Sequence, residues 1–515
     1  MRIGIDVGGT NTDAVLVEGT EVLASHKTPT TPDVGSGIIT ALESVFRGSN
    51  HRPDEISAVM IGTTHFTNAV VERRRLLKSA AIRIALPATQ ALPPMIDWPA
   101  DLREAIGNHV YMVHGGYEFD GREISPLEEK EIREVAADLK RKGIKSAALT
   151  SVFAPVNGKM EERAAEILRE EIPGIYVSLS SEIGRIGLLE RENATIMNAC
   201  LQELAITVVR SFREALNRLG IVAPFYISQN DGTLMSSEYA EKYPILTFAS
   251  GPTNSMRGAA FLSGAMEGVV VDIGGTTSDV GALAHGFPRE ASAEVEIADV
   301  RTNFRMPDLL SFGLGGGSLV RQNNGHMTIG PDSVGYELTT KAMIFGGDTL
   351  TTTDIAVASG QLDLGDRKKV DKLPAKTVTD ALDQIHRMVE AAVDRMKTSA
   401  DPIPVILVGG GSVLISRPIA GASEIQKPKN HAVANAIGAA IAQVGGEVDR
   451  VFMLEGSSRD EALAAAKREA IDKAVQAGAD EQTVKVVDVE EVPLTYLPSN
   501  SIRVRIKAVG DLTLP

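Results

Sequence analysis

Apolar runs rich in β-branched residues lead into short glycine turns at two distant places in the chain. The first turn occupies residues 8–13 (Gly-Gly-Thr-Asn-Thr-Asp) and the second occupies residues 274–279 (Gly-Gly-Thr-Thr-Ser-Asp). A second apolar run follows each turn at once, which is typical of a strand–turn–strand unit. The copies lie about half the chain apart, so they are not a short solenoid repeat. The pattern predicts two domains of similar topology, each starting from the same hairpin.

Between the two turns, helical and strand-like hydrophobic patterns alternate. The segment Ser125-Pro126-Leu127-Glu128 resembles a capping box with proline at the first helical position, and it predicts a helix that ends at Gly143. Apolar runs at residues 147–153 and 175–179 predict strands, with a helix at residues 160–171 between them. This alternation favours a layered α/β domain with a mainly parallel sheet plus hairpins.

Longer patterns follow in the second half of the chain. Residues 188–219 predict a long helix suited to bridging two domains, and residues 225–229 predict a strand. Six later apolar side chains recur at helical spacing and predict a helix packed on a sheet. They are Val378, Leu382, Ile385, Val389, Val393 and Met396.

The last part of the chain changes in character. Residues 458–477 are rich in alanine and charge and predict a helix. Strand-like runs at residues 484–492 and 502–509 follow, joined through Pro498-Ser499-Asn500. We interpret this part as a small α+β appendage.

Length, charge and cysteine content narrow the class of protein. A chain of 515 residues is too long for one ordinary core, and with the repeat it predicts domains at 1–190 and 191–447 and an appendage at 448–515. Its 67 acidic and 52 basic residues give a net charge of −15, so neither nucleic acid nor an anionic membrane is an expected partner. The single cysteine, Cys200, excludes an internal disulfide and suits a reducing compartment. With no signal-peptide pattern after Met1 and no apolar run of roughly 20 residues, we expect a cytoplasmic protein.

The repeated hairpins carry the clearest chemistry. A Gly-Gly pair lets backbone N–H groups approach an anion closely, and the neighbouring hydroxyls add further donors. Asp6 and Asp272 end the strands before the turns, where they would hold Mg²⁺ through water while it bridges phosphate oxygens. One such hairpin alone is usually an ordinary turn, but two copies with Asp before and after favour a site for ATP. The predicted phosphate-binding residues are Gly8, Gly9, Thr10, Asn11, Thr12, Gly274, Gly275, Thr276, Thr277 and Ser278.

Two further glycine clusters lie downstream. The apolar run at residues 404–408 enters Gly409, Gly410 and Gly411, and such a strand can bring flat backbone against an adenine ring. The alternative is a buried parallel strand with a flexible exit. The cluster at residues 312–318, with Gly315 and Gly316 at its centre, is a hinge, a phosphate contact or only a helix start.

The order of two Asp-x-Gly-Gly-Thr hairpins and a strand–glycine cluster resembles the superfamily of sugar kinases, Hsp70 chaperones and actin. The resemblance implies two actin-like (ribonuclease H-like) α/β domains flanking an ATP cleft. Within that superfamily the chain is similar to the hydantoinase A/oxoprolinase family. The segments that carry this similarity are residues 8–13, 61–73, 249–252, 272–280, 313–318 and 347–354.

The family resemblance implies an activity and a partner. Family members use ATP to open cyclic amides such as hydantoins and 5-oxoproline, or to carboxylate ketones. An A-type chain would phosphorylate the amide oxygen, and a separate hydantoinase B-like subunit would hydrolyse the product. Homo-oligomers are compatible with this arrangement. The chain departs from the family at residues 330–336, where a segment with proline and cysteine is usual, and in lacking a long C-terminal extension.

Candidate catalytic residues are Asp6, Asp272, Asp13, Asp279 and His65. Asp13 and Asp279 either orient the phosphate loops or act on the substrate. His65 should lie where a strand meets the cleft, or it is a hydrogen-bonded loop histidine. Two rival functions use the same hairpins: a stand-alone small-molecule kinase, and a chaperone-like ATPase that reactivates a partner enzyme.

Overall fold

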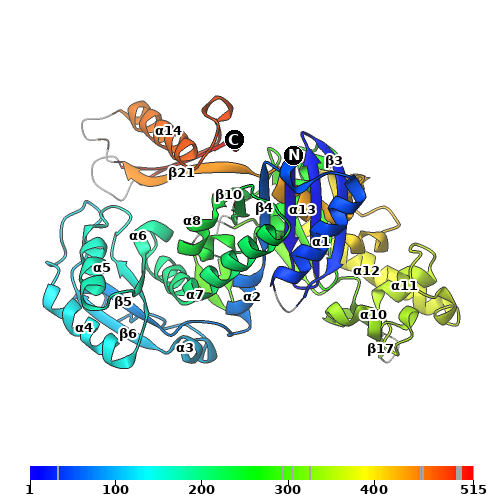
Figure 1. Cartoon of the computed structure of the whole chain (residues 1–515), viewed down its shortest axis with the longest axis horizontal. Helices are drawn as coiled ribbons and strands as arrows, with labels where there is room; N and C mark the ends of the chain where they lie inside the picture. Colours follow the sequence, from blue (N-terminus) through cyan, green and yellow to red (C-terminus); the bar gives the residue numbers. More distant parts are fainter. Residues whose placement is uncertain are drawn as a thin grey trace.

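The computed structural model shows two α/β lobes side by side, with a smaller α/β unit inserted in the first (Figure 1). In Figure 1 the inserted unit is at the left, the second lobe at the lower right, and the N-terminal strands between them. The structure describes residues 1–31, 34–184, 186–291, 295–303, 306–323, 326–452, 454, 458–494 and 501–513.

A nine-stranded sheet forms the first lobe and starts from the first predicted hairpin. Its strand order is β22-β23-β21-β10-β9-β4-β1-β2-β3. Strands β1 to β3 are antiparallel, whereas β4 is parallel to β1 and β9 is parallel to β4. Every residue of β1 after Arg2 is buried, as expected for a strand covered on both faces. The bounds are β1 (Arg2–Val7), β2 (Asn11–Glu18), β3 (Glu21–Pro29), β4 (Ala58–Thr63), β9 (Phe225–Ser228) and β10 (Thr233–Ser236).

The second lobe repeats the same topology. Its sheet has the order β13-β12-β11-β19-β20, with β11 antiparallel to β12 and parallel to β19. This order corresponds strand for strand to β3-β2-β1-β4-β9, which confirms two related actin-like domains. The bounds are β11 (Gly268–Ile273), β12 (Ser278–Ala284), β13 (Phe287–Pro288), β19 (Ile403–Val408) and β20 (Ala422–Gln426). Between β13 and β19 along the chain lie β14 (Val295–Ile297), β15 (Val300–Thr302), β16 (Leu309–Phe312), β17 (Ser318–Asn323) and β18 (His326–Ser333).

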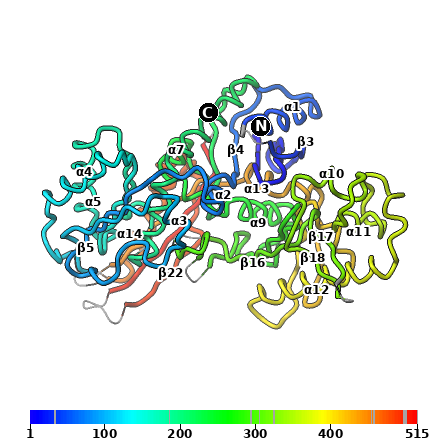
Figure 2. The backbone as a smooth tube through the Cα atoms, turned by 90° about the horizontal axis from the view of Figure 1, so that it is seen from below, coloured from blue at the N-terminus to red at the C-terminus, as the bar shows by residue number. Residues whose placement is uncertain are grey.

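Two helices, α9 (Ser250–Ser263) and α13 (Ala434–Ala440), lie against each other between the sheets (Figure 2). Glycines allow this close approach: a Cβ at Gly258 would overlap the Ala434 carbonyl, and one at Gly438 would overlap the Asn254 carbonyl. The other helices of the lobes are α1 (Val34–Ser49), α2 (His65–Val71), α10 (Leu338–Lys341), α11 (Thr352–Ala358) and α12 (Ala375–Met396). The predicted apolar face of α12 is confirmed, because it packs against the second sheet.

The inserted unit is a parallel sheet of order β6-β5-β7-β8. The predicted strands and helices are confirmed here, but the capping box is wrong. Helix α4 begins at Glu129, and Ser125 Oγ instead donates to the Leu86 carbonyl at 3.0 Å. The bounds are β5 (Ser79–Leu86), β6 (His109–His114), β7 (Ser146–Ser151), β8 (Tyr176–Leu179), α3 (Ala100–Ile106), α4 (Glu129–Lys142), α5 (Lys159–Glu171) and α6 (Ser180–Ile183).

Helix α7 (Leu188–Arg218) joins the inserted unit to the first lobe, because it packs on β7 and on α1. Cys200 is buried on this helix. The short helix α8 (Ser237–Lys242) follows β10.

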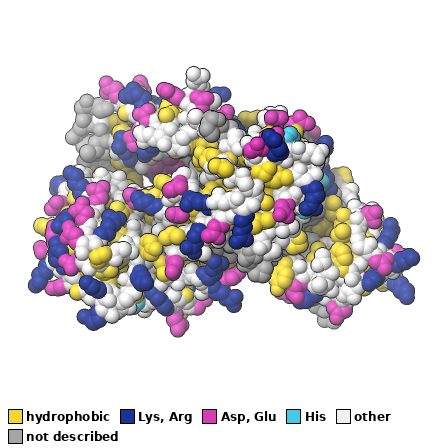
Figure 3. Space-filling view, in the orientation of Figure 1, with side chains coloured by type: hydrophobic (Ala, Val, Ile, Leu, Met, Phe, Trp, Pro, Cys, Tyr) yellow, Lys and Arg dark blue, Asp and Glu magenta, His cyan; other side chains and the backbone are white. Residues whose placement is uncertain are grey.

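Figure 3 shows the face of the molecule that is seen in Figure 1, and basic and acidic side chains are interspersed over its described part.

The C-terminal part forms the predicted helix and two strands, and it extends the first sheet. Strand β21 (Gln443–Phe452) pairs with β10, and β23 (Ile502–Gly510) lies between β21 and β22 (Lys485–Pro493). Helix α14 (Arg459–Gln476) packs on β21 and β23. The predicted connection at residues 498–500 lies outside the described residues. The domain boundaries at 190 and 447 stay a prediction, and strands from both sides of them pair in one sheet.

Candidate functional site

A cavity of about 750 Å³ separates the two sheets, and both repeated hairpins line it. It opens at the carboxyl ends of β1 and β11, where ligands of parallel sheets are usually bound. Most of the predicted site residues come together on its wall. They are Asp6, Gly8, Gly9, Thr10, Asn11, Asp13, Asp272, Gly274, Gly275, Thr276, Thr277, Asp279, Gly316, Gly409, Gly410 and Gly411.

The two glycine turns face each other across the cavity. Thr10 Oγ1 lies 3.5 Å from Thr276 Oγ1, and a Cβ on Gly275 would lie 3.3 Å from Thr10 Cγ2. Each turn is closed by a matching hydrogen bond, from Gly8 N to the Asn11 carbonyl and from Gly274 N to the Thr277 carbonyl, both 3.0 Å. The hairpins therefore present similar backbone donors from opposite sides.

Paired carboxylates flank each turn. Asp6 lies opposite Asp13 in the first hairpin, and Asp272 lies opposite Asp279 in the second. Like charges at directly opposed positions destabilise a sheet, so neither carboxylate pair contributes to the stability of its hairpin through this contact. The presence of such a pair in both hairpins indicates that the cavity binds a cation or stabilises positive charge.

Asp6 and Asp13 are the more deeply enclosed pair. Burial and the neighbouring Asp13 raise the pKa of Asp6 to about 7, against the opposing effects of Lys27 and Asn435. Asn435 Nδ2 donates to Asp6 Oδ2 at 2.8 Å, and Lys27 Nζ lies 2.7 Å from Asp13 Oδ2. Asp6 Oδ1 and Asp13 Oδ1 are buried without a hydrogen-bond partner. Two free acceptor oxygens thus remain beside the first turn.

The second pair is also perturbed. Burial raises the pKa of Asp272, and a hydrogen bond from Ser255 opposes this effect. Burial raises the pKa of Asp279 to about 6, although Ser311 Oγ donates to its carboxylate. Carboxylates with raised pKa values in a cleft are candidates for binding a cation or moving a proton.

The free oxygens suit Mg²⁺ bound partly through water. Among the described residues, no group of three or more His, Cys, Asp and Glu side chains is placed to hold a metal ion alone. Mg²⁺ keeps much of its hydration shell and is often completed by phosphate oxygens, so one or two carboxylates are sufficient. Asp6, which has a free oxygen, therefore fits the predicted metal role, and Asp13 is an additional candidate; the metal role of Asp272 stays a prediction.

Three predicted residues support the loops instead of lining the cavity. Thr12 Oγ1 lies 3.3 Å from Thr30 Oγ1, and Ser278 Oγ donates to the Leu314 carbonyl at 2.7 Å. A Cβ on Gly315 would overlap the backbone of the second turn. Gly316, in contrast, reaches the cavity wall and donates its N–H to the Gly274 carbonyl at 3.0 Å.

The glycines after β19 have different surroundings. A Cβ on Gly409 would overlap Asp272 Oδ1, and one on Gly411 would meet Ile273 Cγ2. These two glycines allow close packing on β11. Only Gly410 of the three faces open space, with nothing within 4 Å of an added Cβ.

An apolar wall, which sequence reasoning missed, lies beside these glycines. It consists of Leu338, Ala356, Leu362, Leu364, Val413 and Leu414, together with Tyr336. Tyr336 is 73% exposed and belongs to the segment that departs from the family pattern. A flat apolar surface next to a phosphate site suits a nucleobase.

His65 lies behind the cleft at the start of α2. Its Nδ1 is 2.6 Å from Thr63 Oγ1, and burial followed by the charge of Arg75 lowers the pKa of His65 to about 4. The imidazole is therefore neutral at physiological pH. The neighbouring Thr64, not His65, is on the cavity wall.

Lys27, Asn435 and Ser255 also line the cavity and were not predicted. Lys27 lies directly opposite Asp13 in the β2–β3 pairing. The register at the Gly19 turn would pair Asp13 with His26, and a register shift between Leu16 and Val17 brings Lys27 opposite instead, so the sequence did not indicate this contact. Asn435 and Ser255 come from α13 and α9, and no local pattern marks them.

Two lobes of one topology, each with an acidic glycine hairpin facing a shared cleft, define an actin-like ATPase fold. The chain belongs to the hydantoinase/oxoprolinase family. Residues 2–172 match the Hydantoinase/oxoprolinase N-terminal region, and residues 191–366 match Hydantoinase/oxoprolinase.

Similar proteins agree with this assignment. The chain is 26% identical over 388 residues to caprolactamase subunit alpha of Pseudomonas jessenii, covering 70% of this chain and 54% of that protein. It is 26% identical over 416 residues to the acetophenone carboxylase gamma subunit of Aromatoleum aromaticum, covering 73% and 56%. The crystal structure of ATP-dependent caprolactamase from Pseudomonas jessenii superimposes with a TM-score of 0.77 at 18% identity, covering 100% of this chain and 88% of that one. The chain spans about half the length of these curated relatives. None of its described helices is long and apolar enough to cross a membrane.

Proposed function

We propose that this chain is the ATP-binding A-type subunit of an ATP-dependent hydrolase of cyclic amides. The observation that carries the proposal is the pair of acidic glycine hairpins facing each other across one cavity. The similarity to caprolactamase subunit alpha supports a lactam-like substrate. The substrate class would include lactams, hydantoins and 5-oxoproline.

ATP would lie along the cavity with its base and phosphates at different walls. The apolar residues around Leu362 and Tyr336 would receive the adenine, beside the open face of Gly410. The backbone N–H groups of both turns would bind the phosphates, with Lys27 adding positive charge. Asp6 and Asp272 would hold Mg²⁺, which neutralises phosphate charge when bound.

The chemical step would activate a poor electrophile. Amide resonance protects a lactam carbonyl, and its oxygen is the more nucleophilic atom. That oxygen would attack the γ-phosphorus, forming an O–P bond while the bond to the β-phosphate oxygen breaks and ADP leaves. The ring N–H proton would go to a nearby carboxylate, for which Asp13 and Asp279 are candidates. Positioning and charge neutralisation supply most of the rate in such transfers.

The phosphorylated amide would then need water and a second active site. The relatives named as subunits support an assembly of more than one chain. We therefore include a hydantoinase B-like subunit as partner. It would add water to the activated carbon, and the ring C–N bond would break with the protonated nitrogen as the leaving group. A second water, attacking the same carbon of the resulting acyl phosphate, would release phosphate and leave the carboxylate. A homo-oligomer of this chain would be compatible with that assembly. A cytoplasmic location would be compatible with the use of ATP as a substrate.

The test is ADP release from the purified chain across a panel of lactams and hydantoins, with and without a B-type subunit. We expect Mg²⁺-dependent ADP formation that one substrate class stimulates, and its loss in Asp272→Asn. His26→Asn, on β3, serves as a control for substitution outside the cavity wall. A stable phosphorylated product formed without a partner would indicate a kinase. Stimulation only by a folded enzyme would indicate a reactivating ATPase. Either result would contradict the proposal.

A further inference from the structure

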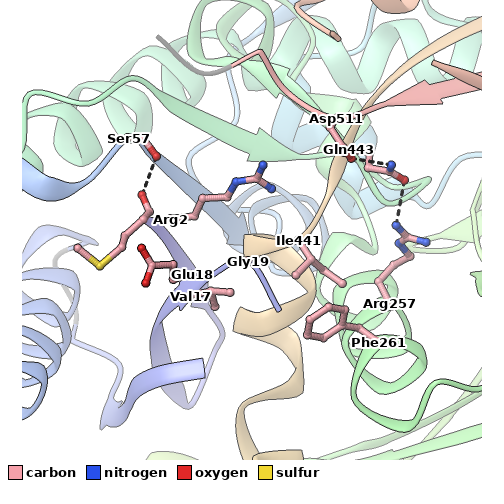
Figure 4. Close-up of a pocket in the computed structure, with 11 residues that line it drawn as sticks. Arg2, Val17, Glu18, Gly19, Ser57, Arg257, Phe261, Ile441, Gln443 and Asp511 are labelled. Carbon is pink, nitrogen blue, oxygen red and sulfur yellow. Dashed lines mark hydrogen bonds between the residues drawn. The ribbon is translucent and has the colours of Figure 1, made fainter. Parts of the chain in front are cut away.

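A second pocket lies at the opposite end of the first sheet from the nucleotide cleft. Its volume is about 550 Å³, within the range of small-molecule sites. The start of β1, the β2–β3 turn, α9 and the ends of α13 and β23 surround it. Figure 4 shows Arg2 and Arg257 reaching into it from different sides.

The two arginines lack the partners that guanidinium groups usually have. Among the described residues, neither Arg2 nor Arg257 has a carboxylate within ion-pair distance. Arg257 donates to the Gly286 carbonyl at 3.1 Å and to Gln443 Oε1 at 3.4 Å, while its Nε is buried without a partner. Burial lowers the pKa of Arg257 to about 10, because desolvation destabilises the charged guanidinium.

The nearest acid that acts on Arg257 is already engaged. Asp231 Oδ2 lies 2.8 Å from Lys507 Nζ, in a contact that buries both side chains. Arg257 instead stacks over the Phe287 ring at 3.8 Å from its centroid. Each terminal nitrogen of Arg257 makes one hydrogen bond and keeps a second N–H. A stacked guanidinium with such N–H groups is a geometry that receives a carboxylate or phosphate.

The rest of the pocket selects between these anions. Phe261 and Ile441 provide apolar surface, and Figure 4 places both beside the arginines. Glu18 and Asp511 also line the pocket, so a multiply charged phosphate would be repelled. The two arginines and the two acids leave these side chains with no net charge, so a single carboxylate on an apolar body meets less repulsion than phosphate and still contacts both the arginines and the apolar wall.

Three elements run from this pocket to the nucleotide cleft. Helix α9 contributes Arg257 to the pocket and Ser255 to the cleft. Helix α13 contributes Asn435 to the cleft. Ile441, the residue directly after this helix, lines the pocket. Strand β1 carries Arg2 at one end and Asp6 at the other. Because α9 and α13 pack closely through backbone at Gly258 and Gly438, a shift of one helix would require the other to move.

We propose that this pocket binds a small monocarboxylate with an apolar body, and that its occupant changes nucleotide affinity through α9 and α13. The ligand is an organic acid or an apolar amino acid, which share the carboxylate and differ in the ammonium group. Glu18 and Asp511 would recognise that ammonium group. This inference goes beyond the proposed function, because carboxylate binding requires neither ATP nor a cyclic amide.

The test titrates the full chain calorimetrically with 4-methylpentanoate and with L-leucine, which have the same apolar body. We expect saturable binding of at least one, weakened about tenfold or more in Arg2→Gln, a loss typical of a charged hydrogen bond. Arg257→Lys, which keeps the charge but not the planar fork, should weaken it as well. If the amino acid is the ligand, leucine binds more tightly and Glu18→Gln removes the difference. If the organic acid is the ligand, Glu18→Gln does not weaken binding.

The coupling is measured as the Kd for a non-hydrolysable ATP analogue with and without the saturating acid. We expect a change of about threefold or more, and linkage requires the analogue to change acid affinity by the same factor. Arg321→Gln, on β17 of the second lobe, is the control and should leave acid binding unchanged. Absence of saturable binding, equal binding to wild type and Arg2→Gln, or tighter binding of inorganic phosphate would overturn the site. Acid binding with an unchanged analogue Kd would overturn the coupling.

Discussion

Replacing Lys27 with methionine isolates one ion pair in the cleft. Lys27 Nζ lies 2.7 Å from Asp13 Oδ2, and the Asp13 side chain is only 1% exposed. Removing one partner of a fully buried pair costs roughly 3–5 kcal/mol, because the remaining charge is uncompensated. The Lys27 side chain is 36% exposed, so water screens the pair. We therefore expect a loss of about 1–3 kcal/mol in the free energy of unfolding.

Urea unfolding of Lys27→Met, Asp13→Asn and the double variant measures this contribution. Asp13→Asn should cost less, because a partly exposed lysine can be solvated by water. The double variant should be more stable than the sum of the single losses predicts, since the two residues share one interaction. Strict additivity, or an unchanged stability of Lys27→Met, would refute the reasoning.

The same variant tests whether Lys27 faces bound phosphate. It is the one basic side chain among the described residues that line the cleft. We expect Lys27→Met to weaken binding of an ATP analogue about tenfold, as for loss of a charge-assisted contact. An unchanged Kd would show that Lys27 serves Asp13 alone.

Three further predictions use other parts of the cleft and its supports. Gly438→Ala should lower stability by about 1–3 kcal/mol, because its Cβ overlaps the Asn254 carbonyl, whereas Gly410→Ala should stay within about 0.5 kcal/mol in the same thermal unfolding assay. The pKa of Asp6 is raised from 3.8 to about 7, so between these values the folded state holds a proton that the unfolded state has lost. Stability should therefore fall as pH rises through this window, and Asp6→Asn should flatten the dependence; an identical slope would contradict the assignment. Tyr336→Ala should weaken adenine nucleotides roughly three- to tenfold and leave binding of inorganic triphosphate unchanged, as for loss of an aromatic contact to the base.

The sequence predicted those parts of the fold that depend on local patterns. Each hairpin is specified within about a dozen residues by an apolar run, a glycine pair and the returning strand. The second half of the inserted unit, with β7, β8, α4 and α5, was predicted for the same reason, whereas β5, β6 and α3 were not predicted. The capping box at Ser125 failed because that hydroxyl is used by the Leu86 carbonyl, a contact that no helix signal reveals.

The rest of the site depends on long-range contacts. Asn435 and Asp6 are 429 residues apart and meet only because α13 packs on β1. Gly409 has the sequence signature of a base-binding loop, yet its own Cβ position is filled by Asp272. The apolar wall around Leu362 comes from separate segments, so its members have no common pattern along the chain.

The central claim is that ATP phosphorylates the oxygen of a cyclic amide in the cleft between the hairpins. The most direct test supplies the lactam that stimulates ADP release with ¹⁸O in its carbonyl, together with ATP and a B-type subunit, and follows phosphate by ³¹P NMR. Phosphorylation at oxygen predicts that the label appears in inorganic phosphate, and that Asp272→Asn abolishes the transfer. Ring opening that leaves the label entirely in the carboxylate product would contradict the account.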